Sequence, residues 1–152
     1  MIIKTKIKNI DVTAGAFDFA FIGGSVGAAE GEAIIYGVQH AIDNKQPFIL
    51  FTASGGMRMF ESLIALSQMT RVTLAINELK KNKLPYIVVL TDPTAGGTTA
   101  SFGMLGDVTF AEPGSVVAFS GKRVIQATVK EELPEDFQTS EYVERSGFID
   151  SW

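Results

Sequence analysis

Two glycine pairs lie in loops whose backbone N–H groups are expected to take part in catalysis. Gly55-Gly56 follows a short apolar run (FILF), and Gly96-Gly97 follows a second one (IVVL). Each pair precedes a segment with helical spacing, so each is predicted to form a turn between a buried strand and a helix. Glycines in such a turn let backbone N–H groups approach a ligand oxygen without obstruction from a Cβ atom. Two such loops predict stabilisation of negative charge on oxygen, as in carbonyl or enolate chemistry.

A single loop of this kind carries little functional information, because many α/β proteins have a tight turn between a strand and a helix. The recurrence of the Gly-Gly pair after a similar strand is what favours a site. Two equivalent loops in one sheet are expected to meet at the same edge, where folds of this class bind ligands.

Other chemistries find less support in the sequence. Neither a GxxxxGK[ST] nor a GxGxxG motif is present, which argues against nucleotide hydrolysis. A triad of Ser54, His40 and Asp92 is not favoured, since TASGG lacks the glycine that a nucleophile elbow places two positions before the serine. No His, Asp and Glu cluster has spacing suited to a metal, so no metal site is predicted.

Four charged residues near the loops have two interpretations each. Arg58 follows the first glycine pair and either grips a phosphorylated cofactor or forms an ion pair with Glu61 or Glu30. Asp92 is expected to cap or fix its loop rather than to act as an acid or base. Lys122 and Arg123 lie at a predicted helix start, as surface residues or as phosphate contacts.

The composition describes one domain, residues 1–152. With 152 residues, 46% of them hydrophobic, the chain is long enough for one buried core and too short for two ordinary domains. The net charge of −4 argues against nucleic acid as a partner. The absence of cysteine excludes disulfides and a cysteine zinc site in this chain and fits a cytoplasmic location. Neither a membrane span nor a signal peptide is expected.

Strands and helices are predicted to alternate, which indicates the α/β class, with ββα units near the ends. Strands are expected at 2–12, 17–24, 47–52, 86–90, 108–113 and 115–120. Helices are expected at 28–43, 56–82, 96–106, 122–133 and 139–147. The last helix is predicted to be capped by Thr139 or Ser140. In the long helix, one stripe is predicted to contain Leu63, Leu66, Thr70, Thr73, Ile76 and Leu79.

Several longer motifs resemble a known family. They are PFILFTASGGMRMFES, LPYIVVLTDPTAGGTTASFGMLGDVTFAEP and GKRVIQATVKEELPEDFQTSEYVERSGFID, preceded by GGSVGAAEGEAI. In this order and spacing they closely resemble the carboxyltransferase β subunit of bacterial acetyl-CoA carboxylase. The resemblance covers roughly residues 17–150, far more than a lone glycine motif.

The resemblance implies a crotonase-like superhelix of ββα units. It also implies transfer of a carboxyl group from carboxybiotin to acetyl-CoA, which gives malonyl-CoA for fatty acid synthesis. The implied partners are a carboxyltransferase α subunit, needed for activity in an α2β2 assembly, a biotin carboxyl carrier protein and biotin carboxylase. Protein side chains need not act as acid or base in such an enzyme.

The family's functional residues carry over onto the two loops. Gly55 and Gly56 would be oxyanion donors, and Gly96 and Gly97 would line the same pocket. Arg58 would lie near the phosphates of coenzyme A. Residues flanking the glycines are expected to contact substrate: Ser54, Thr94, Ala95 and Thr98.

The chain also departs from the family. A four-cysteine zinc ribbon usually begins the β subunit, and further helices usually follow GAID, so the chain is expected to be truncated at both ends. Val26, Ala29, Glu30, Lys122 and Gln126 replace more usual residues, which leaves the shape of the coenzyme A groove and the acyl group open.

Two alternative functions remain open. One is another crotonase-fold acyl-CoA enzyme, a hydratase, isomerase or decarboxylase. A hydratase would need a carboxylate at the pocket, for which Glu61 is the candidate. The other is a non-catalytic assembly module, although a scaffold has no need for both glycine pairs.

Overall fold

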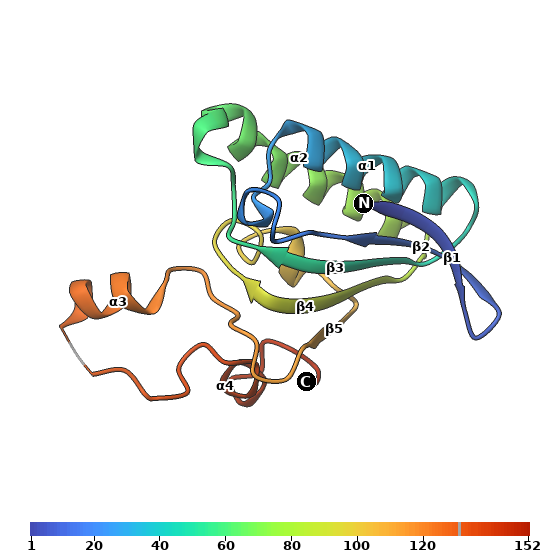
Figure 1. Cartoon of the computed structure of the whole chain (residues 1–152). Helices are drawn as coiled ribbons and strands as arrows, with labels where there is room; N and C mark the ends of the chain where they lie inside the picture. The colour runs from blue at the N-terminus through green and yellow to red at the C-terminus, as the bar shows by residue number, and fades with distance from the viewer. Residues whose placement is uncertain (131) are drawn as a thin grey trace.

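The computed structural model describes residues 1–130 and 132–152 and confirms the α/β class (Figure 1). Five strands form one sheet in sequence order: β1 (Ile2–Ile7), β2 (Ile10–Ala16), β3 (Phe48–Ser54), β4 (Tyr86–Thr94) and β5 (Val108–Ala111). The helices are α1 (Ala28–Asp43), α2 (Ser62–Lys81), α3 (Lys122–Val129) and α4 (Ser140–Arg145), with short 3-10 turns η1 (Ile22–Gly24), η2 (Met59–Glu61) and η3 (Phe102–Met104).

Strand direction decides where the loops gather. β1 and β2 are antiparallel, whereas β2, β3, β4 and β5 run parallel to one another. The segments that follow the four parallel strands therefore all emerge at one edge of the sheet, here called the carboxyl edge. Both glycine pairs lie there.

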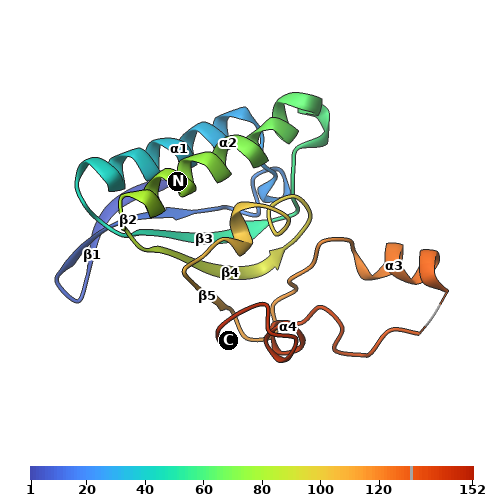
Figure 2. The same ribbon diagram turned by 180° about the vertical axis from the view of Figure 1, so that it is seen from behind.

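One face of the sheet is covered by α1 and α2, which lie side by side across it in both views (Figures 1 and 2). The side chains beneath them are large, apolar and fully buried, notably Phe48, Leu50, Tyr86, Val88 and Leu90. The rings of Phe48 and Tyr86 stack at 5.9 Å, and the Tyr86 hydroxyl donates to the Phe102 carbonyl at 2.9 Å. This core fixes the strands whose ends carry the glycine loops.

The first 24 residues differ from the prediction. The single strand expected at 2–12 is a hairpin, because Lys8 and Asn9 both have positive φ (46° and 69°), as a two-residue type I′ turn requires. The strand expected at 17–24 is a loop ending in η1. Asp18 initiates the turn there, since its side chain accepts from the Ala20 N–H at 2.9 Å.

The long helix begins later than predicted and buries a different stripe. α2 starts at Ser62 rather than 56, and its buried residues are Ala65, Gln68, Val72, Ile76 and Leu79. Leu63 and Leu66 are 76% and 53% exposed, so the N-terminal half of the predicted stripe is wrong. The side chain of Gln68 occupies the space beside Gly31 of α1, where a Cβ would come within 2.7 Å of the Gln68 amide carbon. The buried stripe thus begins at Ala65 and Gln68, and Leu63 and Leu66 point outward.

The C-terminal third also departs from the prediction. The helix expected at 96–106 is one turn followed by η3, and the strand expected at 115–120 forms only isolated bridges, Val117 with Thr94 and Val116 with Thr139. The helix expected at 122–133 ends at Val129, with residue 131 outside the described residues. The cap of α4 is confirmed, since Thr139 accepts from the Tyr142 N–H at 3.2 Å.

Candidate functional site

The two glycine loops lie against each other at the carboxyl edge. The Ala95 N–H donates to the Ser54 carbonyl at 2.8 Å, which ties the loops together. Gly56 has a φ of 110°, and a Cβ there would lie 3.1 Å from the Gly97 nitrogen and 3.2 Å from the Gly96 Cα. Only glycine permits both this backbone conformation and this approach. The expectation that the two loops meet is confirmed.

A third glycine segment, residues 23–27, packs on the other side of the first loop. The Gly55 N–H donates to Gly23, the Val26 N–H donates to Gly56, and the Arg58 N–H donates to Val26, each at 2.9 Å. A Cβ at Gly24 would overlap the carbonyl oxygen of Ala53. The glycine-rich motif GGSVGAAEGEAI therefore packs against the first glycine loop and supports it.

The four predicted glycines differ in whether their N–H groups already have an acceptor outside their own loop. The Gly55 N–H is taken by Gly23, and the Gly96 N–H is shared between Ala118 and Phe119 at 3.1 Å each. Gly55 is predicted to be an oxyanion donor, but in this structure its N–H already has an acceptor, the carbonyl of Gly23. The Gly56 N–H is held only by its own loop, through the Ser54 Oγ at 3.1 Å.

The turn after Gly96 leaves donors without acceptors. The Ala100 N–H closes one helical turn on the Gly96 carbonyl at 3.0 Å. Among the described residues, no acceptor meets the N–H groups of Gly97, Thr98 and Thr99, as expected for the first turn of a helix. These groups give the second loop the capacity to bind a negatively charged oxygen.

Met57 is a residue that sequence reasoning missed. The backbone groups of Gly56 and Arg58 face residue 26, so those of the intervening Met57 face the opposite side, toward the second loop. Its N–H has no acceptor in the described part of the chain, and its side chain packs over Gly97. Only the pairing of Val26 with Met57, which the sequence does not reveal, could have identified it.

The hydroxyl side chains predicted to contact substrate face inward instead. Ser54, Thr94 and Thr98 are all fully buried. Ser54 Oγ lies 2.9 Å from Thr98 Oγ1, and Thr94 Oγ1 donates to the Thr52 and Thr91 carbonyls at 2.9 and 2.8 Å. These hydrogen bonds hold the two loops together, because the polar side chains of each loop point toward the other loop. Ala95 is half-buried and stays at the surface of the pair.

The hydrogen bond between Ser54 and Thr98 predicts a measurable effect on stability. Replacing Thr98 with valine should lower the free energy of unfolding by about 1–3 kcal/mol, because Ser54 Oγ loses its buried partner. Adding Ser54→Ala should cost less than the sum of the two single changes, since both ends of the bond are then gone. Urea denaturation measures both. Thr128→Val, an exposed threonine of α3, is the control, and an effect as large there would contradict the interpretation.

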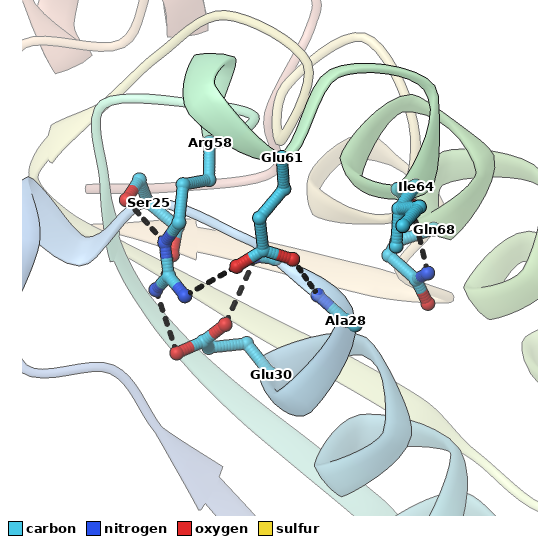
Figure 3. Close-up of polar contacts among 8 residues, drawn as sticks. Ser25, Ala28, Glu30, Arg58, Glu61, Ile64 and Gln68 are labelled. Atoms are coloured by element: carbon cyan, nitrogen blue, oxygen red, sulfur yellow. Dashed lines mark hydrogen bonds and ion pairs between the residues drawn. The ribbon is translucent and has the colours of Figure 1, made fainter.

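Of the two roles expected for Arg58, a phosphate contact or an ion pair, the structure shows the ion pair (Figure 3). It is 7% exposed, and its guanidinium pairs with Glu30 at 2.7 Å and with Glu61 at 2.9 Å. Burial by itself would raise the pKa of Glu30, but hydrogen bonds from Arg58 and Gly27 outweigh it and hold that pKa below its usual value. The hydrogen bond to Glu30 raises the pKa of Arg58 still further. Glu30 and Arg58 are therefore both charged at neutral pH.

Two cavities flank the loops. One, of about 310 Å³, lies between the end of β2, η1 and α1 and is lined by Phe17, Phe21, Gly24, Ser25 and Glu30, among others. The other, also about 310 Å³, lies between the second loop and α4 and is mostly apolar, with Thr99, Ala100, Phe119, Tyr142 and Phe148 in its wall. The paired loops thus stand between two places for ligand or partner groups.

The alternative chemistries do not assemble. The His40 ring lies 2.9 Å from the Thr13 hydroxyl, and Ser54 contacts Thr98, so no triad forms. Asp92 accepts from the Val116 N–H at 2.9 Å, which confirms that it fixes its loop. Within residues 1–130 and 132–152, no group of acidic or histidine side chains has the geometry of a metal site. In the same residues, no helix has the length and apolar character needed to cross a membrane.

The chain has the crotonase-like fold, with four parallel strands and glycine loops that meet at their carboxyl edge. Within that class the chain belongs to the carboxyl transferase domain family, whose pattern matches residues 7–147.

Curated relatives agree with this assignment. The chain is 71% identical over 150 residues to the acetyl-coenzyme A carboxylase carboxyl transferase subunit beta of Pelagibacter ubique, covering 99% of this chain and 48% of that protein. It is 56% identical over 144 residues to the subunit of the same name from Bartonella quintana, covering 95% and 47%. The chain thus spans about half the length of the curated relatives it matches.

Solved structures share the fold. Transcarboxylase 12S with hydrolysed methylmalonyl-coenzyme A bound superposes with a TM-score of 0.86 at 25% identity, covering 97% of this chain and 29% of that one. The Pseudomonas malonate decarboxylase MdcD-MdcE hetero-dimer superposes with a TM-score of 0.85 at 21% identity, covering 99% and 67%.

Proposed function

We propose that this chain carries one half of an acetyl-CoA carboxyltransferase site, which moves a carboxyl group from carboxybiotin to acetyl-CoA and yields malonyl-CoA. The observation that carries the proposal is the contact between two glycine loops that carry backbone N–H groups without an acceptor among the described residues. The family membership and the names of the curated relatives support acetyl-CoA as the acyl substrate.

The loops would supply charge stabilisation. Removing a proton from the methyl group of acetyl-CoA, which the departing biotin would accept, puts negative charge on the thioester oxygen. Backbone N–H groups stabilise such a charge strongly in a dry site. Within residues 1–130 and 132–152, the N–H groups of Gly97 and Met57 meet no acceptor, and that of Gly56 is held by Ser54. Carboxybiotin, when bound from its carrier protein, supplies the carboxyl group. The same donor chemistry suits its ureido oxygen, with Ala95 and Gly96 forming the adjoining surface.

The structure favours this reaction over a hydratase. A hydratase needs a carboxylate free to move a proton at the pocket, and Glu61 was the candidate. Both of its oxygens are occupied, one by Arg58 at 2.9 Å and the other by the Ala28 N–H at 2.7 Å. Glu61 is therefore a structural carboxylate, which supports carboxyl transfer over hydration.

A second subunit would complete the site. Exposed apolar side chains surround the carboxyl edge, with Met59 92%, Phe60 75% and Leu63 76% exposed on one side. On the other side stands α3, which has no buried residue among its eight and carries the exposed Val124 and Val129 (Figures 1 and 2). Apolar surface of this extent marks an interface.

The partner we propose is a carboxyltransferase α subunit in an α2β2 assembly. It would work with a biotin carboxyl carrier protein and biotin carboxylase in the cytoplasm. The curated relatives are named as subunits, and the superposed decarboxylase is a hetero-dimer, which supports a two-subunit site.

Calorimetric titration of acetyl-CoA tests the proposal. We expect binding that appears, or tightens at least tenfold, when the chain is mixed with an α subunit, together with malonyl-CoA formation once carboxylated carrier protein is added. Binding by the chain alone, unchanged by α, would identify a self-contained acyl-CoA enzyme instead. No binding in either case would point to an assembly module.

A further inference from the structure

Arg58 is a buried charge placed directly behind the first glycine loop. Its side chain lies between the segment 23–30 and the η2 turn, with the rings of Phe21 and Phe60 each 5.8 Å from the guanidinium carbon. A buried arginine is stable only when its donors are satisfied. The identity of its acceptors therefore shows what the residue holds together.

The acceptors belong to two separate segments (Figure 3). Ser25 accepts twice, its Oγ from Nε at 3.2 Å and its carbonyl oxygen from Nη2 at 2.8 Å. Glu30 accepts from Nη2 at 2.7 Å, whereas Glu61 accepts from Nη1 at 2.9 Å. The guanidinium thus spans from the supporting glycine segment and α1 to the turn that begins α2.

Both carboxylates continue the network into the first turn of α1. Glu30 accepts from the Gly27 N–H at 2.9 Å, and Glu61 accepts from the Ala28 N–H at 2.7 Å. Two carboxylates facing one guanidinium leave an excess negative charge, which the positive end of the α1 dipole offsets. Every charged group in this network has its partner inside the chain.

The backbone of the same residue pairs with the same segment. The Arg58 N–H donates to Val26, whose own N–H donates to Gly56. Met57, whose N–H meets no acceptor in the described part of the chain, lies between these two bonds. Any displacement of Arg58 relative to residues 23–27 would therefore turn the backbone donors of Gly56 and Met57.

We infer that Arg58 is a positioning residue that fixes the backbone donors of the first glycine loop against the 23–27 segment, and that it does not bind the phosphates of coenzyme A. The inference rests on the proposed carboxyl transfer. It assigns the residue's effect to catalytic turnover rather than to the affinity for the acyl substrate.

The test compares three variants in the full chain assembled with its α subunit. Arg58→Gln removes the network, and Glu30→Gln removes one partner while leaving the Arg58–Glu61 pair in place. Arg71→Gln is the control, because Arg71 of α2 also pairs with a carboxylate of α1, that of Glu32, and contacts Gln68 within α2 without touching the loops. Steady-state rates are measured with acetyl-CoA and with acetyl-3′-dephospho-CoA.

For Arg58→Gln we expect kcat to fall about 10²-fold, the usual effect of misplacing a catalytic group by about 1 Å. The KM should stay within about twofold, and the loss should be the same with both substrates. Glu30→Gln should lower kcat by a smaller factor in the same pattern. A rise in KM that disappears with the dephospho substrate would overturn the inference in favour of a phosphate contact, and unchanged kinetics would also overturn it.

Amide hydrogen exchange separates this inference from the proposed function. Arg58→Gln should speed exchange at residues 24–27 and 55–58 at least tenfold, whereas Arg71→Gln should not. If the wild-type assembly makes no malonyl-CoA, the proposed function fails, while the exchange pattern still decides whether Arg58 holds the loop. Unchanged exchange at both segments would refute the positioning role, with or without activity.

Discussion

Replacing Gly96 with valine is expected to reduce carboxyl transfer by at least about 10²–10³-fold, as much as the loss of an oxyanion donor. Gly96 has a φ of 61°, and a Cβ there would lie 3.1 Å from the Gly55 carbonyl oxygen and 3.2 Å from the Gly56 Cα. These contacts are with backbone atoms, which cannot turn aside as a flexible side chain does. The two loops must separate, which moves the backbone N–H groups of Gly56 and Gly97 apart.

The measurement is malonyl-CoA formation by the assembled subunits, with the thermal unfolding midpoint recorded for each variant. Valine in the left-handed region also strains the backbone by about 1–2 kcal/mol, so a control must separate strain from loop displacement. Gly147→Val provides it, since Gly147 has a φ of 79° and open space around its Cβ position. Near-normal transfer by the Gly96 variant, or an equal loss in the control, would refute the paired-loop mechanism.

The strands of the central sheet could be predicted because their residues leave little choice. The runs at 48–51 and 86–90 are apolar, short and bounded by proline, which is typical of parallel strands buried on both faces. The hairpin at Lys8 and Asn9 was missed because neither residue is glycine, and lysine rarely adopts a positive φ. Alternation at 17–24 suggested a strand, but Asp18 starts a turn through its own side chain.

The site was predictable to the level of the loops and not beyond. Two Gly-Gly pairs after neighbouring strands must come together, so their contact follows from the topology. Which N–H groups remain unpaired depends on the carbonyls of Gly23 and Ala118, and these belong to segments whose path the sequence pattern did not give. The role of Arg58 was undecidable for the same reason, because Glu30, 28 positions away, is its partner only after α1 has packed beside the loop.

The exposed apolar side chains at the start of α2 lead to the second prediction, a large effect on binding of the α subunit. The sequence pattern assigned Leu63 to a buried stripe, yet it is 76% exposed beside the equally exposed Phe60. A charge placed there does not disturb the core of this chain, so the isolated protein should unfold at nearly the same urea concentration. In an interface the same charge would be buried without a partner, which is strongly unfavourable.

We therefore expect Phe60→Glu together with Leu63→Glu to weaken binding of the α subunit about 30-fold or more, equivalent to at least about 2 kcal/mol, and to abolish transfer at subunit concentrations that saturate the wild type. Tyr36→Glu is the matched control, because Tyr36 is 63% exposed on α1 and lies outside this surface. Sedimentation of the mixed subunits measures the affinity. If the double variant still binds α as the wild type does, η2 and the start of α2 lie outside the interface, and the second subunit must approach the glycine loops from the side of α3.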